Sequence, residues 1–117
     1  LRQSTAGQHI NKMLRSLDLV DMLRPTLREH PNGMTAMRAL SRSAARRPLG
    51  CTQKTEIVST DGVVLVRDLP GPFELATTYT AAIASRSSHV DVARTTIELL
   101  VGETTGDLRR RAGFERA

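Results

Sequence analysis

The stretch Pro48-Leu49-Gly50-Cys51-Thr52-Gln53-Lys54-Thr55-Glu56 decides the fold that the sequence predicts. Its apolar run, Leu49 to Cys51, follows a long helical pattern, and polar residues able to start another helix come directly after it. Such a run is typical of a buried strand in an α/β sheet, followed by a polar loop. Ligands of open α/β sheets bind at the carboxyl ends of strands, beside helix N-termini. Thr52 and Gln53 are therefore the first candidates for contact with a ligand.

Both residues also have an ordinary structural interpretation. Thr52 can cap the helix that follows it, and Gln53 can face water without any ligand. For an arbitrary strand end this second interpretation is the more frequent one, and the stretch alone does not decide between the two.

The length and composition indicate one domain with a core of aliphatic side chains. A chain of 117 residues is long enough for one such core and too short for two ordinary domains. Phe73, Tyr79 and Phe114 are the only aromatic residues, so Leu, Val, Ile, Ala and Met must fill the core. No apolar run in the sequence approaches the length that a membrane span needs.

The formal net charge of +5 comes almost entirely from arginine. Most arginines are scattered, and only Arg46-Arg47 and Arg109-Arg110-Arg111 form clusters, both near expected helix ends where cations suit the helix dipole. Aromatic side chains that could stack on bases are scarce, which argues against binding of single-stranded nucleic acid. We therefore expect no nucleic-acid partner.

The single cysteine, Cys51, excludes an internal disulfide and a CxxC metal or redox motif. Its place in the apolar run predicts a small buried hydrophobic residue rather than a nucleophile. The chain begins Leu1-Arg2-Gln3, without an initiator Met or the pattern of a signal peptide. This start predicts that an upstream part has been removed.

The first helix is expected at 6–17, where apolar residues recur with helical spacing. Thr5-Ala6-Gly7-Gln8 has the form of a capping box, and the small side chains leave the backbone N–H groups of the first turn open to an anion. Thr5, Ala6 and Gly7 are therefore candidate ligand-binding residues. An ordinary capped helix is the more frequent explanation of the same residues.

Two further helical patterns follow in the first half of the chain. The segment 19–23 predicts a short helical turn that Pro25 stops, and 34–47 predicts a long helix that ends before Pro48. Asn32 is placed to cap the long helix, so Asn32 and Gly33 are further candidates for ligand contact at a helix N-terminus.

Two segments after the deciding stretch predict strands. Val63-Val64-Leu65-Val66 is apolar and β-branched, and 75–84 is rich in Thr, Ala and Ile around Tyr79. A short helix at 54–58 precedes them. Helices at 88–101 and 107–112 complete the chain, with Gly102 and Gly113 at their C-terminal ends.

The sequence carries no motif for catalysis. It has no HExxH, P-loop, GxGxxG or supported Ser-His-Asp arrangement, and its acidic residues form no evident pair. We therefore expect no enzyme, no catalytic residues, no metal ligands and no cofactor. The candidate residues carry neutral hydrogen-bonding groups, which bind a ligand without transforming it.

The order of these elements resembles the C-terminal half of periplasmic substrate-binding proteins of the molybdate-binding type, which serve ABC transporters. The resemblance covers most of the chain and rests on Thr5-Ala6-Gly7, Asn32-Gly33-Met34, Leu49-Gly50-Cys51-Thr52-Gln53, Tyr79-Thr80-Ala81-Ala82-Ile83, the helix from Arg86 to Leu100, and Arg111-Ala112-Gly113-Phe114. None of these motifs is specific alone; their order and spacing carry the resemblance.

The resemblance implies an α/β fold, the three-layer lobe of a periplasmic-binding-protein-like fold, in a fragment that lacks the first lobe. Residues 1–76 would form part of the second ligand-binding lobe, and 77–84 the crossing strand and hinge. Residues 85–117 would form C-terminal helices that pack on the absent lobe. Left uncovered, apolar residues such as Ile97 and Leu100 would then need another partner, which predicts self-association as a homo-oligomer.

The resemblance also implies a function. The chain would bind a small anion, such as a molybdate-like oxyanion, in an interlobe cleft and deliver it to the membrane permease of an ABC transporter in the periplasm. Ala6 and Gly33 would supply backbone donors. Gln53 stands where the family has a tyrosine, which leaves the choice of anion open.

Two alternatives from other classes stay open. One is the ligand-sensing domain of a bacterial transcription regulator with the same two-lobed fold, which would be cytoplasmic. The other is a basic interaction module, for which steeply salt-dependent binding to nucleic acid would be required.

Overall fold

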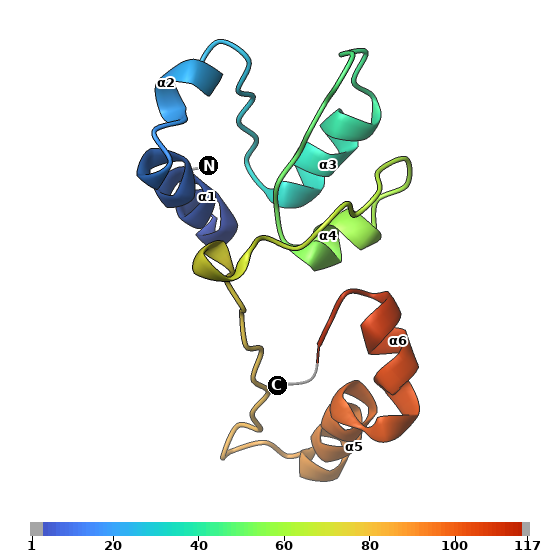
Figure 1. Ribbon diagram of the computed structural model, residues 1–117. Coiled ribbons are helices and arrows are strands. Elements are labelled where there is room, and N and C mark those ends of the chain that lie inside the picture. Colours follow the sequence, from blue (N-terminus) through green and yellow to red (C-terminus); the bar gives the residue numbers. More distant parts are fainter. Residues whose placement is uncertain (1–3, 116–117) are drawn as a thin grey trace. The chain divides into compact units, whose positions relative to one another are not determined.

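The computed structural model of the chain describes residues 4–115, and every regular element in that range is a helix (Figure 1). The predicted α/β lobe is therefore wrong for the described residues, because no sheet is present in them. The segments 49–51, 63–66 and 75–84, which the sequence predicts as strands, have irregular structure.

These three segments form no strands because no side chains pack over them and no neighbouring segment pairs with them among the described residues. A buried strand needs side chains packed on its faces, yet Leu49 is 87% exposed and Val64 and Val66 are each 83% exposed. Within residues 4–115, no ladder of backbone hydrogen bonds joins these segments to a neighbour. Their apolar and β-branched residues favour a strand locally, but a strand forms only against a partner.

The chain divides into two compact units, Leu1–Leu75 and Ala76–Ala117. The first unit contains α1 (Thr5–Ser16), α2 (Val20–Leu23), α3 (Gly33–Ser41), α4 (Lys54–Val58) and the 3-10 turn η1 (Gly71–Phe73). The second contains α5 (Val90–Val101), the 3-10 turn η2 (Glu103–Thr105) and α6 (Gly106–Arg111). The predicted helices are thereby confirmed, although α3 ends at Ser41 rather than near Arg47.

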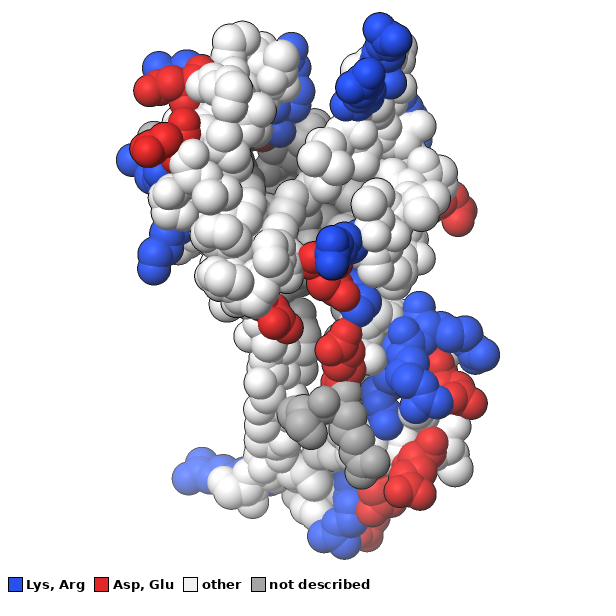
Figure 2. Space-filling model, viewed as in Figure 1, with Lys and Arg blue, Asp and Glu red and all other residues white. Residues whose placement is uncertain are grey.

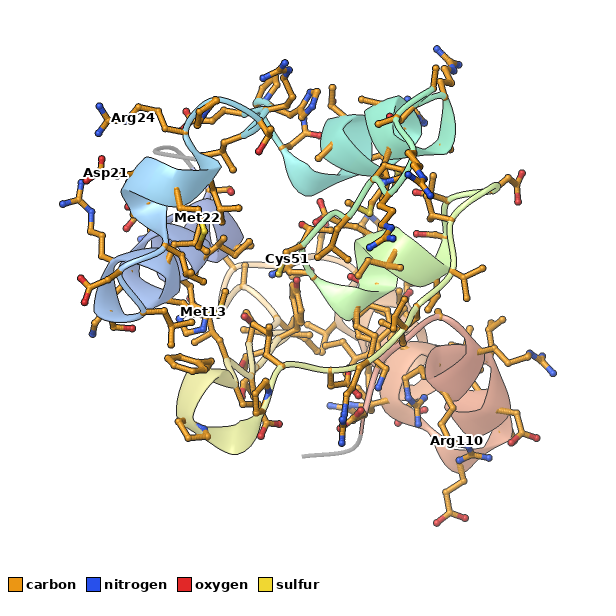
Figure 3. All side chains as sticks on the ribbon, turned by 45° about the horizontal axis from the view of Figure 1, so that its top comes forward. Met13, Asp21, Met22, Arg24, Cys51 and Arg110 are labelled. Atoms are coloured by element: carbon orange, nitrogen blue, oxygen red, sulfur yellow. The ribbon has the colours of Figure 1, made fainter. Side chains whose placement is uncertain are left out.

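In the first unit, α1 lies beside α2 and η1. Asp18 has a φ of 53° after the end of α1, which lets the chain reverse directly into α2. The ring nitrogen Nε2 of His9 donates to the carbonyl oxygen of Phe73 at 2.7 Å, so η1 is fastened to α1. Asp21 and Arg24 pair at 2.8 Å and project away from α2 (Figure 3).

The other part of the first unit is a packed pair of helices, α3 and α4. Met37 of α3 is 1% exposed and is the largest fully buried side chain among the described residues. A Cβ atom on Gly50 would lie 2.6 Å from Cε of Met37 and 2.9 Å from Leu40 Cδ2. Glycine at this position therefore lets the segment before α4 pass closely over the buried face of α3.

In the second unit, side-chain hydrogen bonds from α6 hold it against the C-terminal end of α5. The Arg109 guanidinium donates to the carbonyl oxygens of Leu100 and Gly102 at 2.8 and 2.9 Å, and to Thr105 Oγ1 at 2.7 Å. Cations suit the C-terminal end of a helix, where carbonyl groups lack partners within the helix. Tyr79 and Phe114 meet edge to face with ring centroids 5.9 Å apart.

None of the helices in the described part of the chain combines the length and hydropathy needed to cross a bilayer.

Candidate functional site

Four of the sequence-predicted site residues lie at the junction of α3 and α4. Asn32 is the N-cap of α3 and Gly33 its first residue, while Thr52 and Gln53 directly precede α4. The fold therefore brings the N-terminus of one helix close to the start of another. The packing of α3 against α4 produces this arrangement, because no sheet edge exists in the described residues to do so.

Protein side chains already satisfy the N-terminus of α3. Oδ1 of Asn32 accepts a hydrogen bond from the backbone N–H of Thr35 at 2.8 Å, as the sequence predicts for an N-cap. Oε1 of Glu56 accepts from the backbone N–H of Met34 at 3.2 Å, and Oε2 of the same carboxylate accepts from the Thr52 hydroxyl. A carboxylate from α4 thus sits at the positive end of the α3 dipole.

Gly33 makes this contact sterically feasible. A Cβ atom built on Gly33 would overlap both Thr52 Oγ1 and the Glu56 carboxylate. Just after the end of α4, the Thr60 hydroxyl donates to the carbonyl oxygen of Glu56 at 2.7 Å and lies 3.4 Å from Met34 Sδ. Several short contacts therefore hold Glu56 at the start of α3.

This arrangement has a clear electrostatic consequence. An anion at the N-terminus of α3 would have to displace the Glu56 carboxylate or lie against it, and like charges at close range repel. Thr52 donates to Glu56 instead of capping α4. Gln53 is the N-cap of α4 and its side chain makes no capping hydrogen bond. The Gln53 side-chain amide, a predicted ligand-binding group, is therefore not used in a cap.

The N-terminus of α1 differs from the prediction in its cap. Ser4, not Thr5, is the N-cap, and Ser4 Oγ accepts from the backbone N–H of Gly7 at 3.1 Å. The N–H of Gln8 donates to the Ser4 carbonyl oxygen at 3.0 Å. Gly7 is buried and Ala6 half-buried, so the first turn presents fewer open donors than the capping-box motif predicts.

Within residues 4–115, no hydrogen bond joins Thr5, Ala6 or Gly7 to the residues at the α3–α4 junction. The two groups of predicted ligand contacts are therefore separate features of the first unit. Glu56 and Ser4 are the residues that the sequence analysis missed. Glu56 follows Thr52 by four residues at the start of a helix, and Ser4 directly precedes the proposed capping box; either position could have signalled a cap.

The predicted burial of Cys51 is wrong, because the residue is exposed on the segment that leads into α4 (Figure 3). Protein atoms around it nevertheless remove part of its hydration, and this desolvation raises the pKa of the Cys51 thiol. A raised pKa reduces the thiolate fraction and with it the reactivity of the thiol. Over the described residues, no three His, Cys, Asp or Glu side chains gather as metal ligands would.

The second unit carries a different kind of surface. Val92, Leu99 and Leu100 of α5 are 66%, 59% and 60% exposed, and Leu108 of α6 is 61% exposed. None of the described residues of 76–115 is buried. Around α6, the basic residues Arg109, Arg110 and Arg111 lie with Asp107, and Figure 2 shows blue and red groups side by side there.

Comparison of the chain with protein-family models, with curated proteins and with solved structures finds no match.

Proposed function

We propose that the protein acts by associating with a macromolecular partner rather than by catalysis, and that the outer face of α5 is its association surface. We define this α5 face by Val92, Thr96, Leu99 and Leu100. One observation carries the proposal: a whole compact unit lacks a buried residue in its described part while its longest helix exposes five large aliphatic side chains, three of them on the α5 face.

Physical reasoning connects this observation to binding. Exposed apolar residues scattered singly are normal, but a contiguous group on one face marks an interaction surface. The α5 face spaces its members at i, i+4, i+7 and i+8, which places them on one side of a helix. Ala93 and Ile97, the half-buried residues of the same helix, lie beside Leu100 at one edge of this face.

The test is the binding of an apolar fluorescent dye to the dilute protein. We expect dye binding that falls severalfold in the double variant Leu99→Ser/Leu100→Ser. The control Val64→Ser/Val66→Ser removes two more exposed apolar side chains from an irregular segment of the first unit and should lower dye binding much less. Equal dye binding by the wild type and the α5 variant would contradict the proposal.

A second candidate function is the capture of a small anion for an ABC-transporter permease, as the sequence resemblance implies. The convergence of Asn32, Gly33, Thr52 and Gln53 at the α3–α4 junction favours it. On this account Glu56 occupies the place of the anion and must leave when the ligand binds. On this account the protein would act in the periplasm.

A thermal-shift series with molybdate, tungstate, sulfate, phosphate and small carboxylates tests this second function. A ligand at a hundredfold excess over its Kd stabilises the folded state by about 2.7 kcal/mol. We expect a shift for one oxyanion that persists in moderate salt, grows in Glu56→Gln and is lost in Gln53→Ala. Equal small shifts with every anion, or none, would exclude this function for the chain.

A further inference from the structure

We propose that an exposed basic patch at the C-terminal end of α3 binds the phosphate backbone of double-stranded nucleic acid without reading its sequence. We define this α3 basic patch by four arginine side chains: Arg38, Arg42, Arg46 and Arg47. The patch belongs to the first unit and contains no residue of the α5 face. The inference therefore stands or falls independently of the association surface proposed above.

The net charge of the chain is concentrated in one stretch. Residues 30–55 contain five basic side chains, the four of the patch and Lys54, and no aspartate or glutamate. Of the 17 basic side chains in the chain, 12 therefore lie elsewhere, and the 12 acidic ones balance them. The formal net charge of +5 is thus the charge of this stretch. A basic cluster of this kind typically marks a surface that binds a polyanion.

The arginines of the α3 basic patch are exposed, and they are not paired with acidic groups. Among residues 4–115, no carboxylate lies within ion-pair distance of any of the four. Other basic side chains differ, because Lys54 pairs with Asp68 at 3.2 Å and Arg24 with Asp21 at 2.8 Å. Figure 2 shows blue groups without red ones beside them at the loop that follows α3, in the upper right of the view.

Stabilisation of the helix end explains only half of the patch. Arg38 lies in the last turn of α3 and Arg42 is its C-cap residue, where a cation suits the helix dipole. This effect falls off within the last turn of a helix. Because α3 ends at Ser41, Arg46 and Arg47 lie beyond the reach of its dipole. Their charges need a different explanation, and an anionic partner provides one.

The backbone after α3 turns at once and leaves room for a partner. The N–H of Ser43 donates to the carbonyl oxygen of Leu40 at 3.0 Å, and Ser43 Oγ accepts from the N–H of Ala45 at 3.2 Å. Apart from the arginines and the half-buried Leu40, every residue of 38–47 is alanine or serine. Such small side chains let the phosphate backbone of a nucleic acid come close to the guanidinium groups.

The turn that packs against the end of α3 carries one acidic residue, Asp61. A Cβ atom on Gly62 would lie 3.2 Å from Ser41 Cβ, which brings this turn to the patch. Asp61 forms no ion pair within the described part of the chain. It offsets one of the four positive charges, so about +3 remains on the patch.

The other acidic residues next to α3 belong to its N-terminal end. Glu56 is held there by the N–H of Met34, and Glu29 precedes α3 in the chain. Met34 lies about 12 Å along the helix axis from Arg42, at 1.5 Å for each residue. This separation exceeds the Debye length of about 8 Å at physiological salt. Glu56 therefore does not neutralise the α3 basic patch.

The residue types favour nucleic-acid phosphates over a membrane surface. The patch is built of arginine alone, and the planar guanidinium group matches phosphate with two parallel hydrogen bonds. Binding to a membrane surface also uses large apolar side chains beside the basic ones. Leu49 is the only exposed large apolar residue in 38–49. A single leucine does not form the apolar face that such binding needs.

The same residues favour a duplex over a single strand. Stretch 30–55 contains no aromatic residue that could stack on an unpaired base. The scarcity of aromatic residues, from which the sequence predicts no nucleic-acid partner, excludes stacking on unpaired bases but not contact with phosphates. A duplex presents its phosphates densely, with about one negative charge for each 1.7 Å of helix axis.

Fluorescence anisotropy of a labelled DNA duplex of about 20 base pairs, titrated with the whole chain, tests the proposal. Four phosphate contacts lower the logarithm of the binding constant by about 3.6 for each tenfold rise in salt. The affinity should therefore fall roughly 150-fold between about 50 and 200 mM salt. Two duplexes of unrelated sequence should bind equally, because contacts with phosphates carry no sequence information.

A double variant locates the contact. Arg46→Gln/Arg47→Gln should bind the duplex more weakly, and its affinity should fall only about 12-fold over the same salt range, because two phosphate contacts remain. The control Arg110→Gln/Arg111→Gln removes the same two charges from an exposed cluster in the second unit and should bind like the wild type. Circular dichroism checks that both variants remain helical. Equal weakening by the two variants would show a response to net charge alone and would overturn the patch as the binding surface.

Three further probes test the choice of partner. A single strand of the same length, vesicles that contain phosphatidylserine, and polyglutamate are titrated under the same conditions. The duplex should bind most tightly of the four. Tighter binding of any other probe would overturn the duplex as the partner, and no duplex binding at low salt would overturn the inference altogether. Dye binding at the α5 face does not depend on either result, so the proposed function is tested separately.

Discussion

The backbone N–H of Met34 in the first turn of α3 donates a 3.2 Å hydrogen bond to the carboxylate of Glu56, which lies 22 residues later in α4. The contact links α3 to α4. It also occupies the N-terminus of α3, where the sequence predicts that a ligand binds. It makes Glu56 a structural residue in the ground state of the protein, whether or not an anion displaces it.

Replacing Glu56 by alanine should destabilise the first unit by roughly 1–2 kcal/mol, because the N–H of Met34 and the Thr52 hydroxyl lose a charged acceptor. Glu56→Gln keeps an acceptor oxygen in reach and should cost less than half as much. Urea unfolding, followed by hydrogen exchange in α3 and α4, measures both. Equal stability of the alanine variant and the wild type would show that the carboxylate does not hold the helices together.

Alanine at position 33 tests the steric side of the same contact. Gly→Ala in a helix normally stabilises it by about 0.5–1 kcal/mol. Here the new Cβ atom would collide with Thr52 and Glu56, so Gly33→Ala should destabilise instead. The destabilisation caused by Gly33→Ala should be smaller in a Glu56→Ala background, because that variant lacks the carboxylate with which the new Cβ atom collides.

Gly106 in α6 provides the matched control for Gly33. A Cβ atom there would meet Arg110 Nη1 at 3.6 Å and Arg109 Nη2 at 3.8 Å, which are ordinary contacts. Gly106→Ala should therefore stabilise the second unit slightly. Stabilisation by both substitutions would mean that the space beside Gly33 is open.

Arg109→Ala should destabilise the second unit by roughly 1–2 kcal/mol, because the two carbonyl oxygens and the Thr105 hydroxyl lose the charged donor that the guanidinium supplies. Arg110→Ala is the control, since within residues 4–115 Arg110 pairs with the exposed Asp107 alone and such surface pairs contribute about 0–1 kcal/mol. Hydrogen exchange in α5 and α6 reports the difference. Equal effects of the two substitutions would contradict the assigned role of Arg109.

The sequence predicted the helices well and the strands badly, for one physical reason. Helices such as 6–17 and 88–101 are specified by spacing within a single segment, and caps such as Asn32 act over three residues. A strand depends on a partner segment that its own residues do not identify. Val63 to Val66 therefore satisfied every local criterion for a strand in a chain that provides no pairing partner among its described residues.

The candidate site shows the same limit. Asn32 could be assigned from local sequence, and its cap is confirmed. Glu56 could not, because its contact with Met34 joins residues that only the packing of α3 on α4 brings together. Ser4 could have been found, since a serine next to the threonine of a capping box is an equally good N-cap.

Cys51 gives a prediction about pH. Because desolvation raises the pKa of its thiol in the folded state, the native protein should alkylate more slowly than the urea-unfolded chain near pH 8. The folded state binds this proton more tightly, so the associated stability is present below the unfolded pKa and is lost as pH rises through the folded pKa. Iodoacetamide rates from pH 7 to 10.5 measure the shift. A native rate equal to or above the unfolded rate would contradict it.

Hydrogen exchange of the α5 amides with and without the apolar dye tests the central claim most directly. If the α5 face is an association surface, the amides of Val90–Val101 should exchange severalfold more slowly at saturating dye, while those of α1 and α3 should exchange equally in both samples. Equal exchange of the α5 amides with and without bound dye would contradict an association surface on this face.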